Sequence, residues 1–259
     1  MRELKERILI GILMVILILA ANFISKFLYL IVLLAIFIAA SVELIRMFGL
    51  KTIDKILFIL TSVITVFFLT YFLEKGLLSN SKILIPLYIW FFSVILIIPL
   101  SSKESKFLAS LFSLYLWMSF VFAYFLRSDY GALQTLILFA TIWSLDSFSY
   151  LFGKKFGKNK IAPLISPNKT WEGTIIGIVI SFFVFLILSN IFLGFTYRWI
   201  VLGITIPLYG FFGDLFESFL KRQRGYKDSS SLLKSHGGAL DRFDSFIFAV
   251  IAYYTFLSI

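Results

Sequence analysis

Residues 174–195 read TIIGIVISFFVFLILSNIFLGF, and this stretch decides the fold. It carries no charged side chain over about twenty residues, the length that an α-helix needs to cross the hydrocarbon core of a bilayer. Inside that core a helix satisfies its own backbone hydrogen bonds, whereas an open strand does not. We therefore expect this stretch to form a membrane-spanning helix.

Similar apolar stretches recur along the whole chain. The first follows a basic N-terminus like a signal peptide, but it lacks a small-residue cleavage site, so we interpret it as a retained helix. The sequence predicts an all-α, polytopic integral membrane protein with about nine transmembrane helices. The predicted spans are Ile8–Phe23, Phe27–Ile45, Ile53–Phe72, Ile83–Leu100, Phe107–Phe125, Ala132–Phe152, Thr174–Phe195, Trp199–Leu220 and Phe243–Leu257.

The composition agrees with a membrane protein. Hydrophobic residues make up 60% of the chain and charged residues 15%, whereas soluble domains carry roughly a quarter charged residues. The absence of cysteine excludes disulfides, thiolate metal sites and cysteine nucleophiles. A single histidine makes a zinc site improbable.

The distribution of basic residues predicts the orientation. If the N-terminus is cytoplasmic, the outer side holds only five basic residues, and the other 19 of the 24 lie inside. The outer five are Lys26, Lys75, Lys82, Arg127 and Arg198. This asymmetry follows the positive-inside rule and predicts an N-in, C-out membrane protein. It also accounts for the net charge of +10 without a nucleic-acid partner.

Two connections are longer than the others, at about residues 153–173 and 221–242, and both are predicted to be cytoplasmic. We expect residues 1–130 to form a scaffold of about five spans. Residues 131–259 are expected to form the catalytic region, with about four spans and both long loops.

Acidic side chains gather beside these loops. Asp214, Glu217, Ser218 and Lys221 stand at i, i+3, i+4 and i+7, on one face of a helix. Ionisable groups inside a spanning segment are costly, so we expect them to serve a site; the alternative is a structural ion pair between helices. Carboxylates at one membrane depth suit a hard cation such as Mg²⁺. The candidate metal ligands are Asp214, Asp241, Glu217, Asp244 and Asp146.

The second long loop joins a basic cluster to His236 and to the pair Gly237-Gly238. Cations neutralise phosphate oxygens, and glycines let backbone N–H groups approach an anion. The simpler readings are a positive-inside loop and an ordinary turn. The first long loop carries Ser166, Lys169 and Thr170, whose hydroxyl and ammonium groups suit phosphate or ribose, although no Walker A ending is present. The residues therefore predict a cytoplasm-facing site for a cation, a polyphosphate and a lipid, without naming the reaction.

Two stretches resemble the phosphatidate cytidylyltransferases, or CDP-diacylglycerol synthases, of bacteria. The first is residues 218–222 (SFLKR), then Lys227-Asp228, then residues 236–244 (HGGALDRFD). The second is Asp146, Tyr150, Gly153 and Gly157, then residues 165–173 (ISPNKTWEG). The match covers the C-terminal half of the chain. It departs from the usual pattern at Ser229 and at Lys234-Ser235, where Pro-Gly commonly precedes the histidine.

The resemblance implies the reaction CTP + phosphatidate → CDP-diacylglycerol + pyrophosphate, with Mg²⁺ as cofactor. A second cation, monovalent or divalent, is left open, and a homodimer is implied. The expected catalytic residues are Asp214, Asp241, Lys221, Lys227, Asp228 and His236. The expected substrate-binding residues are Ser166, Lys169, Thr170, Ser218, Arg222, Gly237, Gly238 and Arg242.

Two other functions stay open at this point. A CTP-dependent lipid-alcohol (polyprenol) kinase would transfer the γ-phosphate and release CDP. An ion or phosphate transporter would line a path with its intramembrane acids, but transporters commonly show internal repeats and acids at mid-membrane. This chain shows no repeat, and its acids lie toward the predicted cytoplasmic face.

Overall fold

The computed structural model describes residues 2–49, 103–230 and 237–258. In these ranges the chain forms seven α-helices and one two-stranded sheet. The helices are α1 (Arg2–Ile24), α2 (Lys26–Met47), α5 (Lys103–Tyr130), α6 (Ala132–Phe156), α7 (Trp171–Leu193), α8 (Arg198–Gln223) and α9 (Leu240–Ser258). The strands are β1 (Lys160–Ala162) and β2 (Ser166–Thr170).

Each helix coincides with one predicted span, so the helical architecture is confirmed. Four of them, α2, α6, α7 and α8, are long and apolar enough to cross a membrane. The predicted spans Ile53–Phe72 and Ile83–Leu100 lie outside the described residues. The count of nine helices, the N-in orientation and the division at residue 130 therefore stay predictions.

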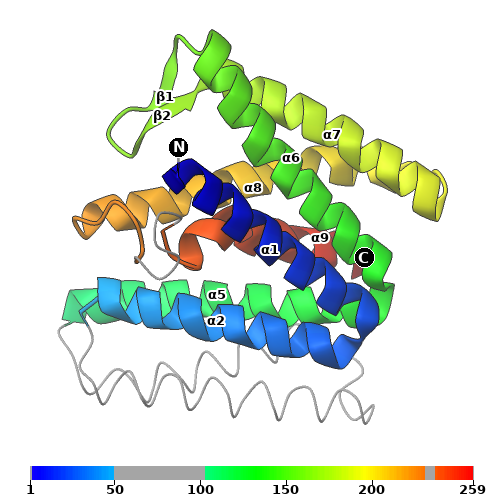
Figure 1. Cartoon of the computed structure of the whole chain (residues 1–259), viewed down its shortest axis with the longest axis horizontal. Coiled ribbons are helices and arrows are strands. Elements are labelled where there is room, and N and C mark those ends of the chain that lie inside the picture. The colour runs from blue at the N-terminus through cyan, green and yellow to red at the C-terminus, as the bar shows by residue number, and fades with distance from the viewer. Residues whose placement is uncertain (1, 50–102, 231–236, 259) are drawn as a thin grey trace.

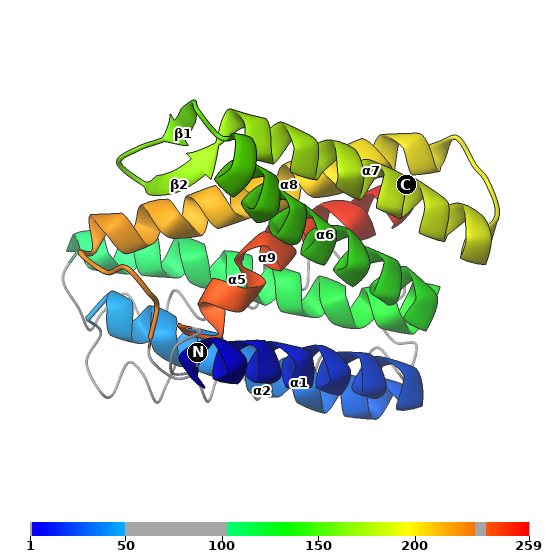
Figure 2. The same cartoon turned by 45° about the horizontal axis from the view of Figure 1, so that its top comes forward.

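Consecutive described helices run in opposite directions along the bundle, so the described connections fall at two opposite ends (Figures 1 and 2). The loop end carries residues 157–170, with the β1–β2 hairpin, and the connection that follows α8. The turn end carries Ser25, Gly131 and residues 194–197, where short connections join consecutive helices. Both long loops of the sequence therefore lie at the same end of the bundle.

The β1–β2 hairpin is a feature that the sequence analysis did not predict. The strands pair antiparallel, with Lys160 opposite Thr170 and Ala162 opposite Ser166. Glu172, in the first turn of α7, accepts the backbone N–H groups of Lys158 (3.1 Å) and Asn159 (3.2 Å). The carboxylate thus fixes the base of the hairpin to the start of the helix.

Small residues allow α6 and α7 to approach closely, which is a common way of packing helices in membranes. A Cβ atom added at Gly173 would lie 2.5 Å from the carbonyl oxygen of Ser149 and 2.6 Å from the Cα atom of Gly153. One added at Gly177 would collide with the Ser149 hydroxyl. This close contact holds the hairpin, which connects the two helices, in one place.

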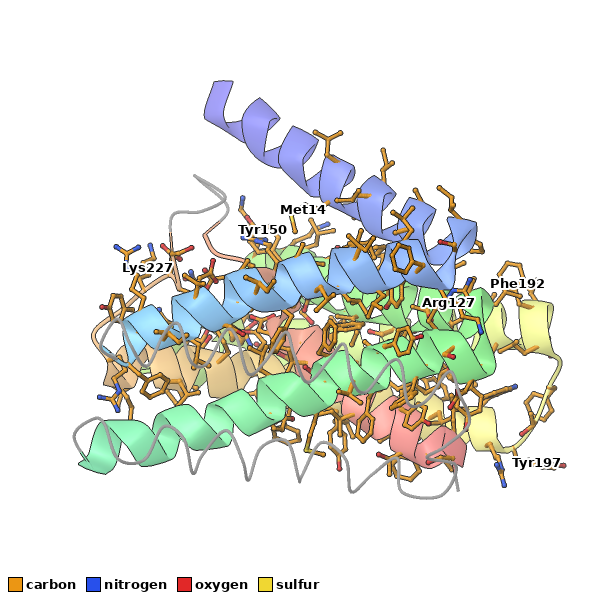
Figure 3. The ribbon with its side chains drawn as sticks, turned by 90° about the horizontal axis from the view of Figure 1, so that it is seen from below. Met14, Arg127, Tyr150, Phe192, Tyr197 and Lys227 are labelled. Atoms are coloured by element: carbon orange, nitrogen blue, oxygen red, sulfur yellow. The ribbon has the colours of Figure 1, made fainter. Side chains whose placement is uncertain are left out.

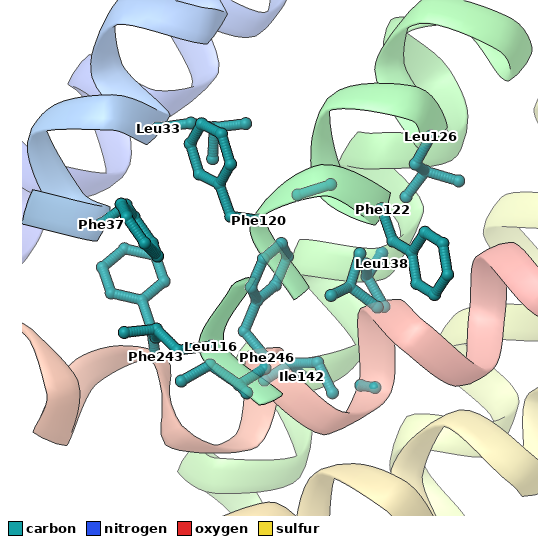
Figure 4. Packing of buried hydrophobic residues seen from close by; sticks show 14 of the residues in the cluster. Leu33, Phe37, Leu116, Phe120, Phe122, Leu126, Leu138, Ile142, Phe243 and Phe246 are labelled. Carbon is teal, nitrogen blue, oxygen red and sulfur yellow. The ribbon is translucent and has the colours of Figure 1, made fainter. Parts of the chain in front are cut away.

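Helix α9 lies at the centre of the described bundle and packs against α2, α5, α6 and α8. Figure 4 shows its apolar side chains among those of the neighbouring helices. The ring of Phe246 stacks on Phe139 of α6 at 4.7 Å, and Phe37 of α2 meets Phe120 of α5 at 5.1 Å. The start of α9 is therefore placed by contacts with several helices.

The turn end is held by polar contacts. Arg127 Nε donates to the carbonyl oxygen of Asn22 at 2.7 Å, and Asn22 Nδ2 donates to that of Ala132 at 2.9 Å. Tyr254 of α9 donates its hydroxyl to Asp129 Oδ2 at 2.9 Å. Figure 3 marks the two ends of the bundle by Arg127 and Lys227.

Candidate functional site

The predicted site residues of α8, α9 and the hairpin meet at the loop end. Lys169 of β2 forms an ion pair with Asp214 of α8, with 2.5 Å between Nζ and Oδ2. Arg222, at the other end of the same helical segment, donates its Nε–H to the carbonyl oxygen of Ile165 at 3.1 Å. The hairpin is thus attached to α8 at two points, and its lysine reaches the part of α8 that lies in the predicted span Trp199–Leu220.

Lys221 is the centre of a buried ionic cluster. Its Nζ atom lies 2.5 Å from Glu217 Oε2, one helical turn earlier, and 2.6 Å from Asp241 Oδ1 of α9. The side chains of Lys221, Glu217 and Asp241 are 9%, 2% and 9% exposed. The shared ammonium group stabilises two carboxylates that would otherwise be costly to bury.

Asp241 also fixes the loop that precedes α9. Its Oδ2 atom accepts the backbone N–H groups of Gly238 (2.7 Å) and Ser229 (2.9 Å) and lies 2.9 Å from the Ser229 hydroxyl. Gly237 has a φ of 78°, and a Cβ atom there would lie 2.5 Å from Asp241 Oδ2. The glycine pair brings the N–H group of Gly238 to the carboxylate of Asp241, while its contact with a substrate phosphate stays a prediction.

A buried acid from the N-terminal helices completes the site. Glu43 of α2 is 3% exposed and accepts the hydroxyl groups of Ser229 (2.8 Å) and Ser230 (2.6 Å). It also accepts the backbone N–H groups of Ala239 and Leu240, both at 2.9 Å. The sequence analysis missed Glu43, although a carboxylate inside a predicted span is the signal that singled out the acids of α8.

The remaining acids lie close to these clusters. Asp146 of α6 repels Asp214, and Asp244 of α9 repels Asp214, Glu217 and Asp146. Ser245 donates its hydroxyl to Asp146 Oδ1 at 3.3 Å. The structure therefore brings all five predicted metal ligands into one region, from three different helices.

The arrangement of these acids bears on a bound cation. In the described part of the chain, no group of three or more Asp, Glu or His side chains forms a ready metal cage. Among the described residues, Lys169, Lys221 and Arg242 are the cations that we find beside the five carboxylates. Glu217 Oε1 is buried and accepts no hydrogen bond. Several carboxylates in one region and an unused carboxylate oxygen fit a divalent cation, and Mg²⁺ often takes only one or two protein carboxylates.

Other predicted residues differ in their exposure. Thr170 is 2% exposed and caps α7 by accepting the Gly173 N–H at 3.3 Å, so its side chain faces the helix. Ser218 is buried and donates to Asp214 Oδ1 at 3.4 Å, while Ser166 is half-buried at the start of β2. Lys227, Asp228 and Arg242 are exposed. His236 lies outside the described residues.

The observations define a class: a helical membrane protein that gathers lysines and carboxylates at the end of its bundle where both long loops lie. The comparison with protein families is more specific. The chain belongs to the family described as the cytidylyltransferase family, whose model matches residues 5–259. This confirms the prediction of a nucleotidyltransferase enzyme.

Curated relatives agree with the family match. The phosphatidate cytidylyltransferase of Staphylococcus aureus (strain COL) is 44% identical over 158 residues, which cover 58% of this chain and 60% of that protein. The protein of the same name from Staphylococcus haemolyticus is 42% identical, with the same coverage. That of Bacillus subtilis is 33% identical over 271 residues, which cover 100% of this chain and 99% of the relative. The chain thus matches about three fifths of the staphylococcal proteins and nearly all of the Bacillus one.

Proposed function

We propose that this protein is a phosphatidate cytidylyltransferase, which converts CTP and phosphatidate to CDP-diacylglycerol and pyrophosphate. The observation that carries the proposal is the buried contact of Lys221 with Glu217 and Asp241, at the end of apolar helices in a chain of the cytidylyltransferase family. The names of the relatives support phosphatidate as the lipid substrate.

The chemistry needs positioning more than a strong base. An oxygen of the phosphatidate phosphate attacks the α-phosphorus of CTP in line, and the bond from this phosphorus to the oxygen that leads to the β-phosphate breaks. The electron pair of that bond leaves with pyrophosphate. Because the attacking phosphate is already an anion, the main tasks of the protein are to hold two anions together and to neutralise their repulsion.

The cations of the site suit these tasks. Lys169 and Arg222 join the hairpin to α8, so phosphates bound there would touch both elements. Lys227 is exposed on the connection after α8 and is free to approach a nucleotide phosphate. We assign phosphate binding to these three residues together with Lys221 and His236.

We also propose that Mg²⁺ is required. Asp214 and Asp241 would hold it, with Glu217, Asp244 and Asp146 nearby, and a second cation would share the same acids. When bound, the metal neutralises charge on the CTP phosphates and on the leaving pyrophosphate. In the structure these two acids contact Lys169 and Lys221, so both lysines would lie beside the metal and could bind substrate phosphates.

The proposed setting is the cytoplasmic membrane, with the loop end facing the cytoplasm, where CTP is available. The apolar helices and the bacterial relatives support the membrane location. The count of basic residues in the loops supports the orientation. A homodimer belongs to the same proposal.

The test uses purified protein, phosphatidate in mixed micelles, and CTP labelled at either the α- or the γ-phosphate, with and without Mg²⁺. We expect α-label in the lipid product and release of pyrophosphate only when Mg²⁺ is present. The γ-label in lipid would identify a lipid kinase and refute the proposal. The absence of any labelled lipid would also refute it and would favour a transporter.

A further inference from the structure

Glu43 stands out because it belongs to a helix far from the other site residues in sequence. It is 3% exposed, and a carboxylate at that depth is costly unless several donors reach it. Four donors do: the hydroxyl groups of Ser229 and Ser230 and the N–H groups of Ala239 and Leu240. They divide evenly, two for each carboxylate oxygen.

Two of these donors belong to the start of α9. The first N–H groups of a helix have no partner within the helix, and they are usually satisfied by a cap from the residue just before it. Here the acceptor for Ala239 and Leu240 is a side chain of α2. Glu43 therefore caps α9 from another helix and also favours its N-terminal dipole. Figure 2 shows the start of α9 lying beside α2.

The other donors connect Glu43 to the ionic cluster. The Ser229 hydroxyl lies 2.8 Å from Glu43 Oε2 and 2.9 Å from Asp241 Oδ2. It has one proton for these two carboxylates, so the two acids share one donor and hold it between them. Asp241 in turn contacts Lys221 at 2.6 Å. A chain of direct contacts thus runs from α2 to Lys221.

A second observation shows how tightly this contact is built. A Cβ atom at Gly238 would collide with both the Ser229 hydroxyl and Glu43 Oε2. The loop can therefore reach Glu43 only because residue 238 lacks a side chain.

We propose that Glu43 is a positioning residue of the cytidylyltransferase site: it fixes the loop before α9, and through Ser229 it sets the place of Asp241 and Lys221. This inference rests on the proposed function. Glu43 touches neither the substrates nor the reacting atoms in this assignment, so its effect is on turnover through the geometry of its neighbours.

The test compares Glu43→Gln and Glu43→Ala with Ser41→Ala, a matched control at a buried polar position on the same helix. Glutamine keeps the size of the side chain but presents an amide group to two of the four donors. We expect kcat per folded enzyme to fall about tenfold or more in both Glu43 variants, because small displacements at a site cost rates of this order. The KM for CTP should change much less, and Ser41→Ala should behave as the parent protein.

Hydrogen exchange of residues 229–242, followed by mass spectrometry, is the second measurement and needs no activity. We expect this segment to exchange faster in both Glu43 variants than in the parent protein. In the Ser41→Ala control it should exchange at the parent rate. If exchange and kcat per folded enzyme stay at the parent values, the inference is wrong. It is also wrong if activity is lost only in proportion to the folded fraction.

The two proposals fail separately. A parent protein without lipid labelling would refute the proposed function, while the exchange measurement would still decide whether Glu43 anchors the loop. Combining Glu43→Gln with Ser229→Ala adds a further check. The two effects on exchange should not add, because both changes break the same contact.

Discussion

At the scale of single residues, the site is built from side chains that each serve two partners. Lys221 pairs with Glu217 and Asp241, Asp241 also holds the backbone of Gly238, and Ser229 lies between two carboxylates. Because these groups are buried, removing one leaves its partners without compensation. The consequence is that substitutions here act on stability and chemistry together, to degrees that differ from residue to residue.

Asp214 offers the cleanest test of the metal proposal. Among the described residues, Asp214 forms an ion pair with Lys169 and accepts a weak hydrogen bond from Ser218, and neither contact holds the backbone of a loop. We expect Asp214→Asn to lower turnover by about 10²-fold or more while the protein stays folded and inserted. The assay is α-labelled CTP at saturating Mg²⁺, with circular dichroism and gel filtration as controls. A near-normal rate would remove Asp214 from the metal ligands.

Asp241→Asn should differ from Asp214→Asn. Asp241 accepts N–H groups from two loop residues as well as contacting Lys221. We therefore expect loss of turnover combined with faster hydrogen exchange of residues 229–242. Turnover loss with unchanged exchange would show that the carboxylate does not fix this loop.

Lys221 allows the stability argument to be tested. Lys221→Gln leaves Glu217 and Asp241 buried without their cation, which costs about 3–5 kcal/mol in comparable cases. We expect a marked drop in the midpoint of thermal unfolding in detergent. The exposed Lys154→Gln on α6 is the control and should change the midpoint little. Adding Glu217→Gln to Lys221→Gln should restore part of the loss, and no restoration would contradict the pairing.

The limit of sequence reasoning is visible at this scale. Helical spacing predicted that Glu217 and Lys221 share a face, because that relation is local. The partners of Glu43 lie 186 to 197 residues further along the chain. No periodicity within a helix contains that information, so the contact emerges only from the packing of α2 against the start of α9.

At the scale of elements, the length of the apolar stretches located the helices, but the sequence did not predict the hairpin. Its strands have only three and five residues, and β2 contains Pro167, which is unusual inside a strand. Such short segments carry too little alternation to be distinguished from a turn. The hairpin also explains why Thr170 is buried, since it ends β2 and caps α7 at once.

The contact between α6 and α7 gives a prediction for an element. Gly177→Leu should separate the two helices, because even a Cβ atom would collide with Ser149. We expect a lower unfolding midpoint and reduced turnover, since the hairpin connects these helices and would move with them. Val179→Leu, at a position of α7 that is 47% exposed, is the control and should be neutral. The smaller change Gly177→Ala should be partly rescued by Ser149→Ala; equal midpoints for Gly177→Leu and the control would contradict the close packing.

At the scale of the whole molecule, the alternation of the described helices separates the two ends. Lys154, in the last turn of α6, lies toward the loop end. Figure 3 shows Lys227 at the same end and Tyr197, 82% exposed, at the turn end. The charge count predicted this grouping of the long loops before any contact was known. It did not predict that a carboxylate of the N-terminal helices would reach the site, because charge counts say nothing about packing.

The orientation can be measured with single cysteines, since the natural chain has none. We expect Tyr197→Cys to react with a membrane-impermeant thiol reagent in intact cells. Lys154→Cys should react only after the membrane is permeabilised. The reverse pattern would place the loop end outside the cell and would contradict both the orientation and the supply of CTP to the site.

The contact between Glu43 and the start of α9 also has a consequence for the synthesis of the protein on the ribosome. When the ribosome adds Glu43, the donors that will surround it are still 186 or more residues from being synthesised. The carboxylate can therefore meet these donors only after residues 229–240 have been made. The start of α9 therefore acquires this anchor late in synthesis, and a chain truncated before α9 would lack the contact between Glu43 and the N–H group of Leu240.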